Sequence, residues 1–206
     1  MIERFDQRTA LLLVDVQKGV DVLEHWGGPS GRRNNPDAEI HLRRLLDAWR
    51  QHEFPVFYTM HDSREPRSPL KLSLPTGEIK EGLEPRPGET VITKDVNSGF
   101  IGTNLELTLQ RQRIHRLVIG GFFTNMCVET TVRMAGNLGF DTYLIADACA
   151  TTNRVGPDRI DRDPELVHAM AVASMDGEFC TALNVRDALG LLDSDADNLL
   201  RRQGNE

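Results

Sequence analysis

Apolar runs of strand length alternate along most of this chain with segments whose apolar residues recur at helical spacing. That alternation is typical of βαβ units built around a mostly parallel sheet. The first run, residues 10–16, is almost wholly apolar, as expected for a central strand covered on both faces. Further strands are expected at 55–60, 90–93, 116–120, 142–146 and 179–183. The sequence therefore predicts an α/β fold.

Capping residues mark where helices begin and end. Helix starts are expected at Asn35, Thr103 and Asp163, because each is followed by a proline or, three positions on, by a glutamate. Helix ends are expected at Gly139 and Gly177, since glycine readily adopts the left-handed conformation that closes a helix.

Composition narrows the function. The chain has 206 residues and a formal net charge of -7. This length suits one domain, and the charge argues against nucleic-acid binding, which needs a basic face. Three cysteines without a CxxC pair favour reduced thiols in the cytoplasm over disulfides or a structural metal. No apolar stretch is long enough to cross a bilayer. We expect a small-molecule substrate, no cofactor and no membrane partner.

The most informative segment leads to Cys127. An apolar run at 117–119 ends in two glycines and a short polar turn, which brings the thiol to the start of a helix. Backbone N–H groups and the helix dipole favour a thiolate there, and the amides of the turn can donate to an oxyanion. A free cysteine is commonly a small buried hydrophobe, and Cys149 and Cys180 are interpreted that way. Cys127 is the candidate nucleophile.

Two charged residues follow other strands. Asp15 comes at the end of the first apolar run, where its carboxylate can accept the thiol proton. Burial would raise the pKa of Asp15 and a neighbouring cation would lower it. Lys94 follows the run at 90–93 and is the candidate cation. A lysine after a strand is usually solvated, so its candidacy depends on Asp15 and Cys127 lying at the same edge of the sheet, where α/β folds bind ligands.

These segments together resemble the isochorismatase-like cysteine hydrolases, a family that includes nicotinamidases and carbamoyl-amide hydrolases. The matching pieces, in the family's order, are Leu13-Val14-Asp15-Val16-Gln17, Lys94-Asp95-Val96-Asn97-Ser98-Gly99-Phe100 and Gly121-Phe122-Phe123-Thr124-Asn125-Met126-Cys127-Val128. The resemblance implies a three-layer α-β-α sandwich of Rossmann-like type. The resemblance covers most of residues 9–192, which are expected to be the core of a single domain over residues 1–206. The sequence from residue 193 to residue 206 is interpreted as a solvated tail.

The resemblance further implies a catalytic triad, with Asp15 as proton acceptor and donor, Lys94 as stabilising cation and Cys127 as nucleophile. It implies a cis peptide bond between Phe122 and Phe123, which aims the Phe123 amide, together with that of Cys127, at the substrate oxygen. The expected reaction is hydrolysis of a C–N bond in a small amide, ureide or carbamoyl compound through a thioester. Relatives assemble as dimers or tetramers, so we expect a homo-oligomer.

Substrate contacts are expected from residues that flank the catalytic positions. The candidates are Gln17, Trp26, His61, Asn97, Phe100, Phe122 and Phe123. The alternative for Trp26 and Phe100 is that they fill the core or an interface. Residues 63–89 contain five prolines and no periodic pattern, which predicts a long loop that helps to determine the substrate.

No metal is expected. Nicotinamidases of this family carry an Asp-x-His ligand pair after the second strand, whereas this chain has Thr59-Met60-His61-Asp62 there. A lone His61 is more often a hydrogen-bonding neighbour than a ligand, because a metal site needs several convergent ligands. This departure also weakens nicotinamide as the substrate.

Three other functions stay open. Hydrolysis of a vinyl ether, the isochorismatase reaction, is one, although those relatives characteristically lack the cysteine. A thiol redox or sensor protein would use Cys127 but would not need Asp15 and Lys94 beside it. A binding protein could keep the fold without turnover. Ammonia release would favour the amidase, and stoichiometric peroxide consumption the sensor.

Overall fold

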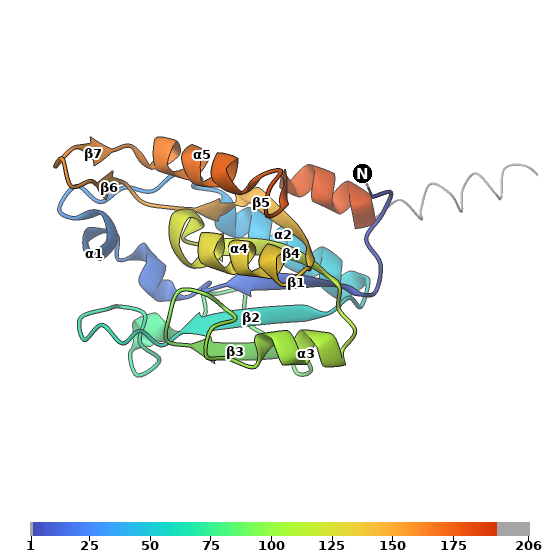
Figure 1. Ribbon diagram of the computed structural model, residues 1–206. Helices are drawn as coiled ribbons and strands as arrows, with labels where there is room; N and C mark the ends of the chain where they lie inside the picture. The colour runs from blue at the N-terminus through green and yellow to red at the C-terminus, as the bar shows by residue number, and fades with distance from the viewer. Residues whose placement is uncertain (1, 193–206) are drawn as a thin grey trace, which may run out of the picture.

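The computed structural model describes residues 2–192, in which six strands form a central sheet with the order β3-β2-β1-β4-β5-β8 (Figure 1). Every neighbouring pair in this sheet is parallel. The strands are β1 (Thr9–Val14), β2 (Val56–His61), β3 (Thr90–Lys94), β4 (Arg116–Phe122), β5 (Asp141–Ala150) and β8 (Thr181–Leu183). The predicted α/β class is confirmed.

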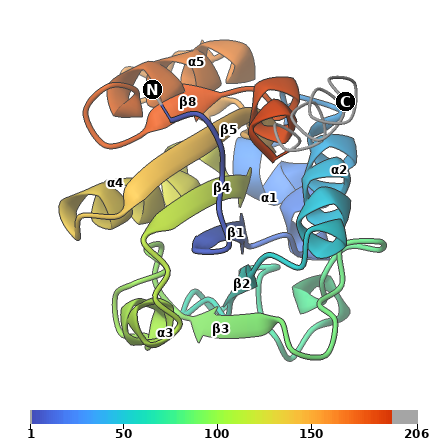
Figure 2. The same cartoon turned by 90° about the vertical axis from the view of Figure 1, so that its right-hand side faces the viewer.

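Helices cover both faces of the sheet, which gives the predicted three-layer sandwich (Figure 2). They are α1 (Leu23–Gly27), α2 (Ala38–Gln51), α3 (Leu105–Arg111), α4 (Glu129–Asn137) and α5 (Pro164–Met175). α2 and the helical residues 185–192 pack on one face, and α3, α4 and α5 pack on the other. None of the helices within residues 2–192 is both long and apolar enough to span a membrane.

β1 separates the two apolar cores. Leu11 and Leu13 belong to the core beneath α2, whereas Ala10, Leu12 and Val14 belong to the core beneath α3, α4 and α5. All five side chains are fully buried. Burying each of the larger ones contributes about 1.5–3 kcal/mol to folding. The strand is therefore fixed in register from both sides, and so is the residue that follows it.

The start of α2 differs from the expectation. Asp37, not Asn35, is the N-cap residue, and Asn35 adopts a left-handed φ of 43°. Its side-chain amide donates instead to the carbonyls of Cys149 at 2.7 Å and Ala146 at 3.2 Å. The asparagine thus fastens the loop before α2 to β5, a contact that local sequence does not reveal.

The other predicted helix ends mostly agree with the structure. No capping box forms at α3, whose N-cap residue is Asn104; the Thr103 hydroxyl accepts the Leu105 amide at 3.3 Å and donates to the Gly99 carbonyl at 2.6 Å. Asp163 caps α5 by accepting the amide N–H two residues on. Gly139 and Gly177 have left-handed φ values of 84° and 79° just after α4 and α5.

Several elements were not predicted. They are α1, two 3-10 turns at Lys18–Asp21 and Pro75–Gly77, and a hairpin of β6 (Arg154–Val155) and β7 (Asp161–Arg162). β5 runs to Ala150, beyond the expected strand at 142–146, and its register against β4 shifts between Ile119 and Gly121. The predicted tail at 193–206 lies outside the described residues.

Candidate active site

The carboxyl ends of the strands gather at the end of the molecule where α1 and the β6–β7 hairpin lie (Figure 1). The chain leaves β1 toward β2 and β3 and then returns to β4 on the other side of β1. Ligands bind in open α/β sheets at such a switch point. Asp15 follows β1, Lys94 ends β3, and Cys127 follows β4. Folding therefore brings the three predicted residues to one edge.

Asp15 and Lys94 form a buried ion pair. The Lys94 Nζ lies 2.7 Å from Asp15 Oδ2, and both side chains are fully buried. The Thr59 hydroxyl donates to the other carboxylate oxygen, Oδ1, at 2.6 Å. Burial alone would raise the pKa of the Asp15 carboxyl, but the Lys94 charge beside it helps to hold that pKa below the ordinary 3.8. Asp15 is therefore an ionised carboxylate.

Cys127 lies in a single π-helical turn, Thr124–Val128, that leads into α4. Its Sγ is 3.6 Å from His61 Nδ1, and the thiol is buried. Burial and the Asp15 charge raise the pKa of Cys127 well above 9.0, although Lys94 opposes them. The site thus opposes the thiolate that the helix start favours, because it disfavours a second anion beside Asp15.

The peptide bond between Phe122 and Phe123 is cis, as expected. Both phenylalanines are buried, and the ring of Phe123 packs against Trp26 with centroids 5.1 Å apart. Within residues 2–192 the Phe123 amide donates to no other group. Gly121, just before the pair, has a φ of 135°, and a Cβ there would lie 2.1 Å from the Val14 carbonyl oxygen. β4 thus approaches β1 closely beside Asp15.

A cavity of about 260 Å³ opens onto Cys127. Its lining comes from α1, the ends of β2 and β4, the loop after β3 and the proline-rich loop. The lining residues are His25, Trp26, His61, Ser63, Arg64, Glu65, Ser68, Leu70, Asp95, Asn97, Phe122, Phe123, Met126 and Cys127. Five of the seven expected contact residues are among them: Trp26, His61, Asn97, Phe122 and Phe123.

Gln17 and Phe100 do not line the cavity. The buried Gln17 amide donates to the carbonyls of Gly77 at 2.9 Å and His61 at 3.1 Å, and its oxygen accepts the His61 amide at 2.8 Å. Phe100 packs in the core against Phe140, with ring centroids 5.9 Å apart. Gln17 therefore links the chain after β1 to residues 61 and 77. Phe100 is a core residue, which was the alternative interpretation of its role.

Sequence reasoning missed Thr59 and the closeness of His61 to Lys94. His61 Nδ1 is 3.0 Å from Lys94 Nζ, and the two residues are direct neighbours in the β2–β3 ladder. Thr59 is likewise paired with Val14, the residue before Asp15. The signal for both was the order and register of the strands. At the mouth of the cavity, an exposed ion pair joins Arg64 to Asp95 at 2.7 Å.

One group within the described residues has the composition of a metal site. Ligand atoms of Asp15, His61 and Cys127 lie within 4.8 Å of one another. The Lys94 ammonium, however, lies 2.7 Å from Asp15 Oδ2 and 3.0 Å from His61 Nδ1. A divalent cation would have to displace this positive charge, so the arrangement suits an ammonium better than a metal. The expectation of a metal-free site stays a prediction.

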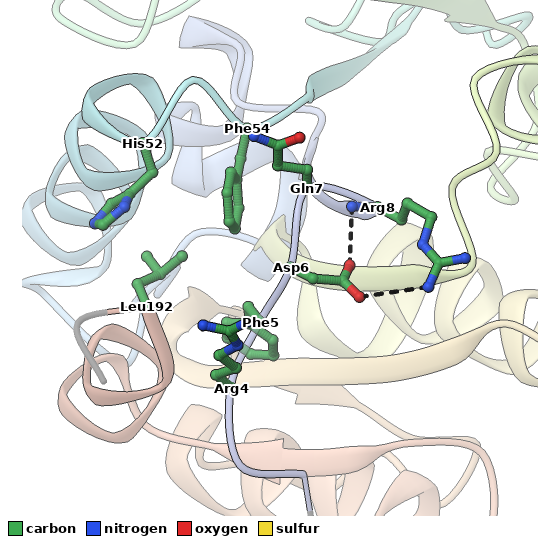
Figure 3. A pocket seen from close by; sticks show the side chains of 8 residues that line it. All are labelled: Arg4, Phe5, Asp6, Gln7, Arg8, His52, Phe54 and Leu192. Atoms are coloured by element: carbon green, nitrogen blue, oxygen red, sulfur yellow. Dashed lines mark hydrogen bonds and ion pairs between the residues drawn. The ribbon is translucent and has the colours of Figure 1, made fainter. Parts of the chain in front are cut away.

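A larger cavity, of about 680 Å³, lies at the other end of the strands (Figure 3). It is lined by Arg4, Phe5, Asp6, Gln7, Arg8, His52, Phe54 and Leu192. Residues 4–8 precede β1 and residues 52–54 precede β2, so this cavity faces the amino ends of the strands. Asp6 pairs with Arg8 within it. It contains no nucleophile, and its size alone does not make it the reactive site.

Comparison with known proteins settles the family. The family model described as the isochorismatase domain matches residues 9–187. The chain belongs to the isochorismatase family. The uncharacterized isochorismatase family protein YrdC of Bacillus subtilis is 42% identical over 178 residues, which cover 86% of this chain and 92% of YrdC.

Two further proteins extend the comparison. The crystal structure of an isochorismatase family protein from Chromobacterium violaceum superposes with a TM-score of 0.86 at 43% identity. The match covers 93% of this chain and 97% of that chain. The ureidoacrylate amidohydrolase RutB of Agrobacterium fabrum is 37% identical over 84 residues, which cover 41% of this chain and 36% of RutB.

Proposed function

We propose that this protein is a cysteine-dependent hydrolase that cleaves a C–N bond of a small amide, ureide or carbamoyl compound. The observation that carries the proposal is the convergence of Asp15, Lys94 and Cys127 at one cavity. Lys94 Nζ lies 2.7 Å from Asp15 Oδ2, and Cys127 Sγ lies within 4.8 Å of an Asp15 oxygen. The partial similarity to an enzyme named as a ureidoacrylate amidohydrolase supports this substrate class.

In the proposed first half-reaction, Asp15 takes the Cys127 proton as the sulfur attacks the substrate carbonyl carbon. The raised pKa of the buried thiol is consistent with proton transfer during attack. The amides of Phe123 and Cys127 donate to the oxyanion of the tetrahedral intermediate. Collapse breaks the C–N bond, and protonated Asp15 gives its proton to the leaving nitrogen. A thioester on Cys127 remains.

In the second half-reaction, Asp15 takes a proton from water, which attacks the thioester carbonyl. The C–S bond breaks, and the proton returns from Asp15 to the Cys127 sulfur. Lys94 stabilises the negative charge on Asp15 and on the sulfur in both halves. Its ammonium keeps the charge of the site balanced whenever Asp15 is ionised.

The competing functions fit the site less well. A redox sensor needs an accessible cysteine with a low pKa, whereas Cys127 is buried and burial raises its pKa. The isochorismatase reaction on a vinyl ether does not require a nucleophilic cysteine at this position. A binding protein without turnover would not need a proton acceptor beside a thiol.

Ammonia release from a panel of small amides, ureides and carbamoyl compounds tests the proposal. Cys127→Ala should abolish release while the protein stays folded. Cys180→Ala is the matched control, because Cys180 is a buried core thiol with a pKa raised to about 12 by burial. Full activity in folded Cys127→Ala protein would refute the nucleophile. Absence of ammonia release from every compound by the wild type would count against an amidase.

We also propose that the protein works in the cytoplasm as a homo-oligomer, a dimer or tetramer, built from one catalytic domain per chain. The reduced state of Cys127, Cys149 and Cys180 is consistent with that compartment. Analytical ultracentrifugation would measure the number of subunits, and a monomer at micromolar concentration would contradict this proposal.

A further inference from the structure

The Lys94 ammonium is fully matched by three acceptors. A protonated lysine has three N–H donors and no acceptor. The Nζ lies 2.7 Å from Asp15 Oδ2, 3.0 Å from His61 Nδ1 and 3.1 Å from the Val96 carbonyl oxygen. Each proton therefore has one partner, and His61 supplies the only uncharged side chain among the three.

This match fixes the protonation of His61. Because the ammonium can only donate, Nδ1 must accept, and the ring proton of neutral His61 must be on Nε2. Nδ1 is 3.6 Å from Asp15 Oδ2, which is too long for an N–H···O hydrogen bond to that carboxylate. With its lone pair engaged by Lys94, Nδ1 is also not free to take the Cys127 proton, which leaves Asp15 as the acceptor.

The other ring nitrogen, Nε2, is available to a ligand in the cavity. The His61 ring lines the cavity in front of Cys127, and within residues 2–192 its Nε2 has no hydrogen-bond partner. An N–H group at the wall of a mostly apolar cavity requires an acceptor from whatever fills that cavity. Trp26, Leu70 and Phe122 are among the apolar side chains that line the same cavity.

We propose that His61 is a neutral, Nε2-protonated imidazole that holds the third proton of Lys94 with Nδ1 and donates its Nε2–H to a second acceptor oxygen of the substrate. This inference rests on the proposed function and narrows its substrate class. The preferred compounds carry a carbonyl oxygen in addition to the one that is attacked, as acylated ureas do. Simple amides and alkylureas lack that oxygen and leave the Nε2–H unpaired.

Two substitutions separate the roles of the two ring nitrogens. In His61→Asn, the side-chain oxygen replaces Nδ1 as an acceptor, and the donor at Nε2 is lost. In His61→Gln, the longer side chain places an amide N–H near the position of Nε2, and the acceptor at Nδ1 is lost. His41→Asn is the matched control, because His41 hydrogen-bonds to the Asp147 carbonyl outside the cavity.

The first measurement is alkylation of Cys127 by iodoacetamide, with Cys127→Ala as the blank. It needs no substrate, so it decides the Lys94 role even if no amide is hydrolysed. Loss of the Nδ1 acceptor leaves one N–H of Lys94 without its partner, so the ammonium is no longer held in place to stabilise the thiolate. We expect His61→Gln to react about tenfold more slowly than wild type, and His61→Asn and His41→Asn to stay within about threefold.

The second measurement is protection of Cys127 from iodoacetamide by acetylurea and by ethylurea, which differ in one carbonyl oxygen. Acetylurea should protect wild-type protein at about tenfold lower concentration. His61→Asn should lose this advantage, and His61→Gln should keep it. Circular dichroism and cooperative urea unfolding verify that each variant is folded.

Several outcomes would overturn the inference. Alkylation that slows in His61→Asn but not in His61→Gln would mean that Nδ1 acts as a donor or as the base for the thiol. Equal protection by the two ureas, or none, in wild-type protein would refute the substrate contact, as would an advantage that survives in His61→Asn. Protection without ammonia release would support the His61 contact and count against the proposed hydrolysis alone.

Discussion

The Thr59 hydroxyl lies 2.6 Å from Asp15 Oδ1 and donates to it, while the same hydroxyl oxygen accepts the Asp15 amide at 3.2 Å. One side chain on β2 therefore holds both the backbone and the carboxylate of the residue that follows β1. The other carboxylate oxygen faces Lys94. Thr59 and Lys94 thus fix the orientation of the Asp15 carboxylate together, one at each oxygen.

Thr59→Val should lower kcat/KM by about tenfold or more, because a hydrogen bond to a charged group contributes about 1.5–3 kcal/mol. Valine keeps the shape and removes the donor. Thr59→Ser is the control and should retain most activity, since it keeps the hydroxyl. Steady-state ammonia release measures the effect. Equal activity in wild-type and folded Thr59→Val protein would show that this hydroxyl does not matter to the reaction.

The buried pair of Asp15 and Lys94 should be strongly coupled in stability. Asp15→Asn leaves the Lys94 charge buried without its partner, and Lys94→Met does the same to Asp15. Each single change should cost about 3–5 kcal/mol in the free energy of unfolding, and the double variant should cost clearly less than their sum. Urea denaturation of all four proteins completes the cycle. Additive costs would be inconsistent with a direct pair.

Gly121→Ala should destabilise the fold severely. Its φ is 135°, and the added Cβ would lie 2.1 Å from the Val14 carbonyl oxygen, which is backbone and cannot turn aside. We expect a loss of more than about 3 kcal/mol, together with loss of activity, since β1 and the Asp15 position would move. Gly190→Ala is the control, because nothing lies within 4 Å of its added Cβ. Similar urea midpoints for the two variants would contradict the steric argument.

Glu39 should make stability depend on acid pH. Its ion pairs with Arg33 and Lys80, at 2.7 and 2.8 Å, help to lower the pKa of Glu39 from 4.5 to about 2 against the raising effect of burial. A lowered pKa in the folded protein gives stability that is present above pH 4.5 and is lost as the pH falls toward 2.

Glu39→Gln should therefore unfold more easily than wild type at pH 6, by about 1 kcal/mol after allowance for partial exposure. The two proteins should converge as the pH approaches 2. Urea midpoints measured across this range test the expectation, and a difference that grows toward low pH would have the wrong sign. The two partners of Glu39, Arg33 and Lys80, also lie over the ring of Phe122, at 5.4 and 5.5 Å from its centroid.

The positions of Asp15, Lys94 and Cys127 could be predicted because each follows an apolar strand, and parallel strands bring their carboxyl ends to one edge. Thr59 could not be found this way. It lies inside β2, and its importance comes from pairing with Val14 in the β1–β2 ladder. His61 was assigned to the pocket, but its contact with Lys94 depends on the β2–β3 register. The role of a residue that depends on how two strands pair cannot be predicted from the local sequence around that residue.

Other errors have the same origin. Asn35 looked like a helix cap because the local pattern fits, but its amide is engaged by carbonyls of β5. Gln17 looked like a substrate contact because it lies two residues after Asp15, but it bonds to backbone groups of residues 61 and 77. The turn that carries Cys127 favours a thiolate when it is considered alone, but burial and the Asp15 charge across the sheet edge raise the pKa of this thiol.

The proline-rich loop is tied to the strand end that carries Asp15. The amide of Lys80 donates to the Val16 carbonyl, the amide of Lys18 donates to the Glu78 carbonyl, and the Gln17 side chain bonds to Gly77. The cavity wall, by contrast, comes from residues 63–70 of the same loop. A change of length before residue 76 would therefore reshape the cavity wall and leave these ties in place, whereas an insertion at 77–80 would displace Asp15 itself.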